Sequence, residues 1–98
     1  KDKFYTWYDL TEKRCHYCGI PQEVLETIAD NRTASFLHVD RKDNSSGYQL
    51  ENIVFACGMC NLVKSAYLSY LEMVEIGERF MKPKWQNKLQ LLSANSEV

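Results

Sequence analysis

The sequence predicts a small α+β domain that is built around a four-cysteine zinc site and flanked by helices. Three observations lead to this prediction. The four cysteines fall in two C-x-x-C pairs, a strand–turn–strand pattern runs into the second pair, and helical patterns lie on both sides. The chain has 98 residues, so we expect one domain over 1–98. A chain of this length buries a limited core, and a bound metal or oligomerisation is an expected support.

Composition and charge narrow the class of protein. Hydrophobic residues make up 45% of the chain and charged residues 26%, which is typical of globular rather than disordered proteins. The formal net charge of −1 gives little indication of nucleic-acid binding, so any basic surface must be local. We see no apolar run long enough for a membrane span and no signal peptide, and we expect a cytoplasmic protein. The chain begins at Lys1, which is compatible with one domain of a longer protein.

The cysteines predict a structural Zn²⁺ site. Two thiolates two residues apart can hold one metal from a tight loop, and two such loops complete a tetrahedron. Without secretory features, paired C-x-x-C units favour zinc over disulfides or redox motifs. The four ligands would be Cys15, Cys18, Cys57 and Cys60.

The segments upstream of the hairpin are predicted to be helical. Apolar residues at helical spacing over 3–13 predict a helix that leads into the first pair, with Tyr8 as a half-buried packing residue. Pro21 suits the first position of a second helix, which Val24, Leu25 and Ile28 continue.

The middle of the chain is predicted to form an antiparallel hairpin. Residues 35–41 alternate as a strand, and the apolar end of 50–56 predicts a buried one. Turn residues over 43–47 predict a long connecting loop, in which Gly47 is suited to a positive φ.

A helix is expected to begin at Asn61, directly after the second pair, so that a strand–strand–helix core extends over about 35–66. A Ser-Tyr-Leu-Glu capping-box pattern begins a helical part over 69–92. Within this part, Pro83 is expected to end one helix and start the next.

The hairpin, the second cysteine pair and the following helix together resemble the HNH, or ββα-metal, nuclease motif. A wider set of positions resembles the PacI-type HNH restriction endonucleases. This resemblance implies a ββα-metal core and a metal-dependent endonuclease that hydrolyses phosphodiester bonds in double-stranded DNA. Cutting both strands would favour a homodimer. The residues that carry the resemblance are Phe4-x-x-Trp7-Tyr8, Cys15-x-x-Cys18-Gly19-Ile20, Val39-Asp40-Arg41, Gly47-Tyr48, Asn52, Cys57-x-x-Cys60-Asn61 and Lys64.

The resemblance implies that Asp40 and Asn61 bind one catalytic Mg²⁺ or Mn²⁺. Carboxylate and amide oxygens suit such hard cations. Taken singly, Asp40 could be a turn residue and Asn61 a helix N-cap, but their joint placement beside a cysteine pair favours ligands. The resemblance also implies that Asn52 pins the loop between the strands through backbone hydrogen bonds. Lys64 is either a contact to a DNA phosphate or a solvated helix lysine.

Arg41 stands where HNH nucleases have the histidine that acts as general base. An arginine cannot accept a proton, but it can clamp the scissile phosphate. Tyr8 matches a tyrosine near that phosphate in PacI-type enzymes, although phenols ordinarily titrate near about pH 10. His38, on the same strand face as Asp40, offers an imidazole better suited to base chemistry. Because the resemblance supports Tyr8, we rank it ahead of His38.

Three alternatives stay open. The chain could be a nicking, homing or junction-cleaving HNH nuclease. It could instead be a degenerate HNH zinc module that only binds nucleic acid, which Arg41 and the near-neutral charge motivate. The motif Cys-x-x-Cys-Gly also occurs in iron-tetrathiolate electron carriers, but the segment from Asp40 to Lys64 would have no role there.

Overall fold

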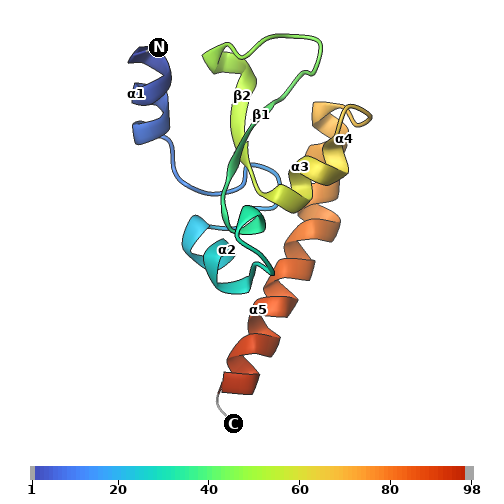
Figure 1. Cartoon of the computed structure of the whole chain (residues 1–98). Coiled ribbons are helices and arrows are strands. Elements are labelled where there is room, and N and C mark those ends of the chain that lie inside the picture. Colours follow the sequence, from blue (N-terminus) through green and yellow to red (C-terminus); the bar gives the residue numbers. More distant parts are fainter. Residues whose placement is uncertain (1, 97–98) are drawn as a thin grey trace.

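The computed structural model describes residues 2–96 and shows a two-stranded hairpin between helices, with a long helical column at the C-terminal end (Figure 1). The molecule is elongated, with principal extents of 48 × 29 × 19 Å. Within the described part of the chain, no helix is both long and apolar enough to cross a membrane. The predicted α+β architecture is confirmed. The helices and strands are α1 (Asp2–Leu10), α2 (Gln22–Ile28), β1 (His38–Arg41), β2 (Ile53–Ala56), α3 (Gly58–Lys64), α4 (Tyr70–Ile76) and α5 (Lys82–Ser96).

The register of the hairpin decides which side chains share a face. β1 and β2 pair antiparallel, with Asp40 opposite Val54 and Val39 opposite Phe55. Opposite residues share a face, and successive residues alternate between faces. His38 therefore lies on the same face as Asp40, and Phe55 lies on the other.

Both strands are shorter than the sequence patterns predict. A turn of 3₁₀ helix, Thr33–Ser35, precedes β1, and another, Leu50–Asn52, occupies the start of the second strand segment. The strands contain only the residues that are paired across the hairpin, 38–41 with 53–56. Side-chain alternation alone does not show where that pairing ends.

The long loop between the strands is organised by Asn52 rather than by a glycine. The Asn52 side chain donates to the carbonyls of Asp43 and Gly47 and accepts the N–H of Asp43, at 2.8–3.1 Å. The expected positive φ at Gly47 is wrong. The glycine with a positive φ is Gly19, at 77°, immediately after the first cysteine pair.

Several helix boundaries differ from the predictions. α1 ends at Leu10, earlier than the predicted segment. Pro21 is the N-cap of α2, with extended dihedral angles of −71° and 154°, and not its first helical residue. α3 begins inside the second cysteine pair, because the Cys57 sulfur accepts the N–H of Cys60 and caps the helix. Asn61 therefore lies within the helix and is not an N-cap.

The C-terminal helices form one column. The capping box of Ser69 and Glu72 at the start of α4 is confirmed. The predicted break at Pro83 is wrong, because a π-helical turn, Gly77–Met81, joins α4 to α5, and the column continues through it (Figure 1). A proline has no N–H to donate, and the wider turn just before it accommodates the missing hydrogen bond.

The column packs directly on the first cysteine loop, by which we mean Cys15 to Cys18; the second cysteine loop is Cys57 to Cys60. The indole N–H of Trp85 donates to the carbonyl of Cys18 at 2.9 Å. Gly77 is buried so closely against Tyr17 that a β-carbon there would collide with the Tyr17 backbone and lie 2.8 Å from its side chain. This contact is possible because glycine has no β-carbon.

Replacing Gly77 with alanine tests this contact. We expect Gly77→Ala to lower the free energy of unfolding by about 1–3 kcal/mol, because the added methyl group must displace backbone. Urea unfolding of the zinc-loaded protein measures this. Gly58→Ala is the matched control, since a β-carbon there would be 3.7 Å from its nearest neighbour, an ordinary contact. Equal stability of the two variants would contradict the close approach.

Candidate active site and metal centre

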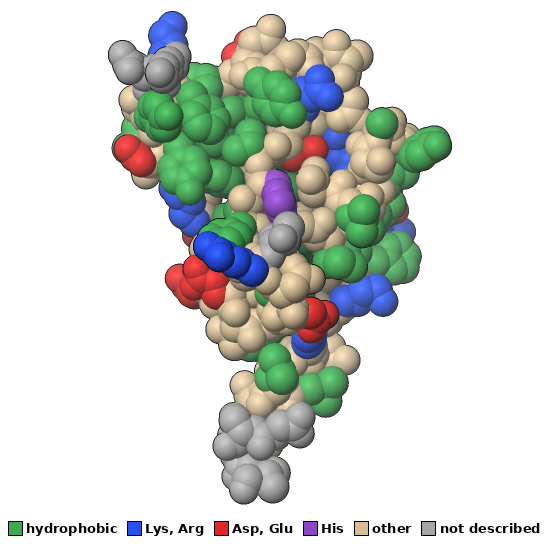
Figure 2. Space-filling view, viewed as in Figure 1, with side chains coloured by type: hydrophobic (Ala, Val, Ile, Leu, Met, Phe, Trp, Pro, Cys, Tyr) green, Lys and Arg blue, Asp and Glu red, His purple; other side chains and the backbone are tan. Residues whose placement is uncertain are grey.

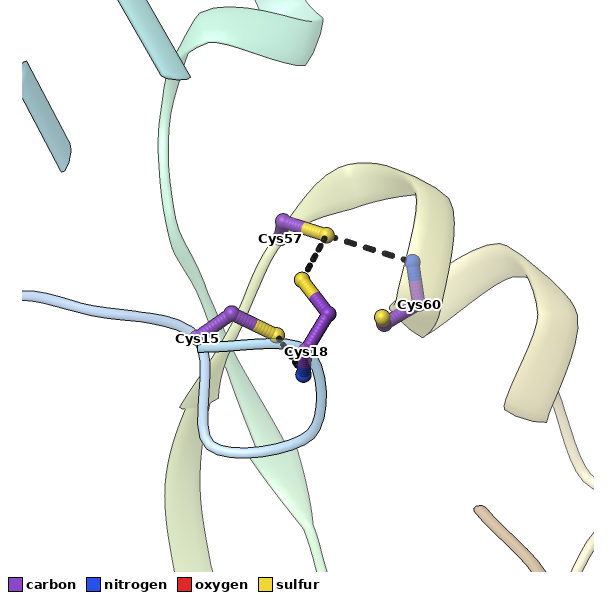
Figure 3. Close-up of side chains that lie close together, drawn as sticks. All are labelled: Cys15, Cys18, Cys57 and Cys60. Atoms are coloured by element: carbon purple, nitrogen blue, oxygen red, sulfur yellow. Dashed lines mark hydrogen bonds between the residues drawn. The ribbon is translucent and has the colours of Figure 1, made fainter. Parts of the chain in front are cut away.

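The structure brings the four cysteines to one point. All four are buried, and their sulfur atoms lie within 4.8 Å of one another (Figure 3). The sulfurs of Cys18 and Cys57 are 3.8 Å apart. A tetrahedral Zn²⁺ with Zn–S bonds of about 2.3 Å would separate its ligand sulfurs by about 3.8 Å. The donor set and its spacing therefore fit a zinc ion.

The four sulfurs are close enough to influence one another's ionisation. The N–H of Cys18 donates to the Cys15 sulfur at 3.5 Å, and the N–H of Cys60 donates to the Cys57 sulfur at 3.4 Å. Hydrogen bonds from Cys18 and the other cysteines lower the pKa of Cys15, whereas interaction with Cys15 raises the pKa of Cys60. Thiols this close cannot all ionise without a cation, because their charges repel.

A second feature is an open cavity of about 530 Å³ where β1, the long loop and α3 meet. Asp40, Arg41 and Asn61 all line it. Adjacent residues of a regular strand would face opposite ways, but β1 ends at Arg41, and both Asp40 and Arg41 reach the same cavity. The other lining residues are Val39, Asn44, Tyr48, Leu62, Ser65 and Ala66.

Asp40 is only 8% exposed and is held by two donors. The phenol of Tyr17 donates to its Oδ2 atom at 2.8 Å, and the ammonium of Lys64 lies 3.5 Å from the same oxygen. Lys64 also donates to the carbonyl of Arg41 at 2.8 Å and to the side-chain oxygen of Asn44 at 3.1 Å.

The placement of Lys64 corrects an expectation. This side chain is completely buried, so it is not a solvated helix lysine, and its amine contacts protein groups on three sides. A contact from Lys64 to a DNA phosphate is not supported by this position. The hydrophobic pattern of this helix did not predict that Lys64 would be buried. The apolar residues beside it, Leu62 and Val63, are the exposed ones.

Tyr17 is a site residue that sequence reasoning missed. Burial, followed by its hydrogen bond to Asp40, raises the pKa of Tyr17, so the phenol keeps its proton and acts as a donor. Its position between Cys15 and Cys18 was the signal that the sequence offered. Nothing local in the sequence relates it to Asp40, which lies on a different element.

Arg41 is held beside the cavity by the loop. Its guanidinium donates to the carbonyl of Ser46 at 3.2 Å and lies 5.1 Å from the centre of the Tyr48 ring. Tyr48 is exposed and lines the same cavity. The resemblance includes Tyr48, but the sequence analysis assigned it no role at the site.

The structure does not bring Tyr8 to this cavity. The Tyr8 ring packs on Phe55, with ring centres 5.3 Å apart, and the amine of Lys13 lies 4.6 Å from the Tyr8 ring. Phe55 is on the hairpin face opposite to Asp40. Tyr8 is exposed rather than half-buried as the sequence predicts, and it belongs to a group of hydrophobic side chains over α1 that includes the exposed Tyr5 and Leu10 (Figure 2).

His38 is not among the residues that line this cavity in the described part of the chain. It is half-buried on the same face as Asp40. Its imidazole lies beside the start of α3, with Nε2 about 3.7 Å from where a β-carbon of Gly58 would be.

Comparison with known proteins gives one informative match. No family model and no curated protein matches the chain. Among solved structures, the chain is similar to PacI, described as a rare-cutting HNH restriction endonuclease with a mechanism of DNA perturbation. The TM-score is 0.75 and the identity 30%; the match covers 89% of this chain and 64% of the PacI chain, just under two thirds of it. This chain therefore has an HNH-like α+β fold around a buried four-cysteine cluster, and the resemblance read from its sequence is confirmed.

Proposed function

We propose that this chain is a metal-dependent HNH endonuclease that hydrolyses phosphodiester bonds in double-stranded DNA. The observation that carries the proposal is the cavity that Asp40, Arg41 and Asn61 line together, in a fold similar to that of an HNH restriction endonuclease. A protein that only binds nucleic acid would not need the carboxylate of Asp40 and the amide of Asn61 in one cavity.

Asp40 and Asn61 would hold the catalytic Mg²⁺ or Mn²⁺. Their oxygen donors suit these ions, which keep several waters and need few protein ligands. When bound, such an ion polarises the phosphate and stabilises the leaving oxygen. Arg41 would bind the scissile phosphate and balance the charge that develops on it. The carbonyl of Ser46 holds the guanidinium at the edge of the cavity.

We infer that His38 acts as the general base. It shares a strand face with Asp40 and is two residues away, roughly 7 Å along the strand. A general base can act on the attacking water directly or through one bound water. Imidazole accepts protons near neutral pH. Tyr8, which the sequence favours, packs on the opposite face of the hairpin, and this placement supports His38 over Tyr8.

The four cysteines would hold a structural Zn²⁺ that takes no part in the chemistry. A site closed by four thiolates leaves no open position for water or substrate. Cutting both strands in one binding event favours two cavities on a two-fold DNA site, so we further propose that two copies of the chain meet on one DNA site. A monomer that nicks one strand is the alternative.

Loss of one metal ligand tests the cavity. We expect Asn61→Ala to lower Mg²⁺-dependent plasmid cleavage by more than about 100-fold, because it removes a direct ligand of the ion. Asn87→Ala, an exposed position on α5, is the matched control and should cleave normally. Asp40→Asn is preferable to Asp40→Ala, since the amide keeps an oxygen acceptor beside the buried amine of Lys64. Strong cleavage by Asn61→Ala would contradict the proposed ligand set.

Zinc removal tests the structural centre. We expect one Zn²⁺ per chain by elemental analysis, and a strong chelator should unfold the protein, as followed by circular dichroism. Zinc binding at such sites contributes on the order of 10–16 kcal/mol to folding. Cys57→Ala should behave like the chelated protein, whereas Asp40→Asn should retain its zinc. A folded, zinc-free Cys57→Ala protein would rule out a structural role.

A panel of three variants identifies the base. We expect His38→Gln to lower the cleavage rate by roughly 10²–10⁴-fold at unchanged DNA affinity, the usual contribution of a general base. Tyr8→Phe and Tyr48→Phe should each retain most of the activity. Single-turnover cleavage and fluorescence anisotropy give the two quantities. If Tyr8→Phe is inactive and His38→Gln is not, the base is the tyrosine that the sequence favours; the same result at Tyr48 would assign the role there.

A further inference from the structure

We propose that Tyr17 and Lys64 orient the Asp40 carboxylate for the catalytic metal, so that the two cysteine loops set the geometry of the cavity. Both are positioning residues, because they act through Asp40. This inference rests on the proposed function, in which Asp40 is a metal ligand.

The two donors converge on one oxygen of Asp40. The phenol of Tyr17 is 2.8 Å and the ammonium of Lys64 is 3.5 Å from Oδ2. A carboxylate offers two oxygens, and fixing one of them prevents the group from rotating freely. Since Asp40 lines the cavity while Oδ2 is tied to protein donors, Oδ1 is the oxygen left for a cation.

The first cysteine loop fixes Tyr17. This residue is 4% exposed and lies between Cys15 and Cys18. The loop is attached to β2 by the N–H of His16, which donates to the carbonyl of Phe55 at 2.8 Å. On the other side, Gly77 packs closely on the Tyr17 backbone, so the loop cannot move toward the C-terminal column without displacing it.

The second cysteine loop fixes Lys64. This lysine is the last residue of α3, the helix that begins at Gly58 within that loop. Its amine also donates to the carbonyl of Arg41, at the end of β1, and to Asn44 in the long loop. Each cysteine loop therefore contributes one donor to the same carboxylate oxygen, and Lys64 additionally holds the strand end that carries Arg41.

The test removes the Tyr17 hydroxyl alone. Tyr17→Phe keeps the ring and its packing, and Lys64 still contacts Asp40. We expect the affinity of the zinc-loaded protein for Mn²⁺, measured by calorimetry without DNA, to fall about 10-fold or more, because loss of an outer partner of a metal ligand typically costs 10–100-fold. Cleavage should need correspondingly more Mn²⁺ for half-maximal rate, with a smaller effect at saturation.

Tyr70→Phe is the matched control. Tyr70 packs near the same loop and hydrogen-bonds His16 at 2.7 Å, but its hydroxyl makes no contact with Asp40 among the described residues. It should retain wild-type Mn²⁺ affinity, and all variants should retain their zinc. Equal Mn²⁺ affinities for wild type and Tyr17→Phe, with normal cleavage by the wild type, would overturn the positioning role alone. A wild type that neither binds Mn²⁺ nor cleaves DNA would overturn this inference and the proposed function together.

Discussion

The convergence of two distant cysteine pairs on one point is the constraint on which the rest of the structure depends. A two-stranded hairpin is marginally stable in water by itself. Here β2 leads directly into the second pair, and the first pair hydrogen-bonds to the same strand through His16 and Phe55. A metal at four thiolates supplies a folding free energy much larger than any contribution expected from so short a hairpin. The strands can therefore remain short and still present their side chains in a fixed register.

The buried ion pair of Lys64 and Asp40 has a different role from the four-cysteine cluster. Removing a lysine and a carboxylate from water is costly, and such pairs contribute little net stability compared with apolar packing. Lys64 is nevertheless completely buried, with three oxygen acceptors around its amine. Losing one partner would strand the other charge, which typically costs 3–5 kcal/mol. The pair is better explained by the orientation that it imposes on Asp40 than by stability.

Local patterns predicted the two C-x-x-C pairs, both strands and the capping box at Ser69, because each depends on residues close in sequence. The joining of the two pairs at one point was predicted from chemistry, since a tetrahedral metal needs four ligands. Features that depend on distant contacts could not be predicted. Pro83 continues a helix because a π-helical turn precedes it, and that turn coincides with the contact between Gly77 and Tyr17. Likewise, Lys64 is buried because the end of α3 packs against the end of β1. The hydrophobic periodicity of the sequence does not predict this contact.

The weak net charge of −1 is compatible with phosphate binding, because the electrostatics of a cavity are local. Arg41 places a permanent positive charge at its edge, and Lys64 places another behind Asp40. A histidine at the position of Arg41 would carry its charge only part of the time near neutral pH. Exchanging it for arginine keeps the phosphate-binding charge and removes the proton acceptor. In the proposed function the acceptor then comes from a separate position, and His38 is the candidate that shares a face of the hairpin with Asp40.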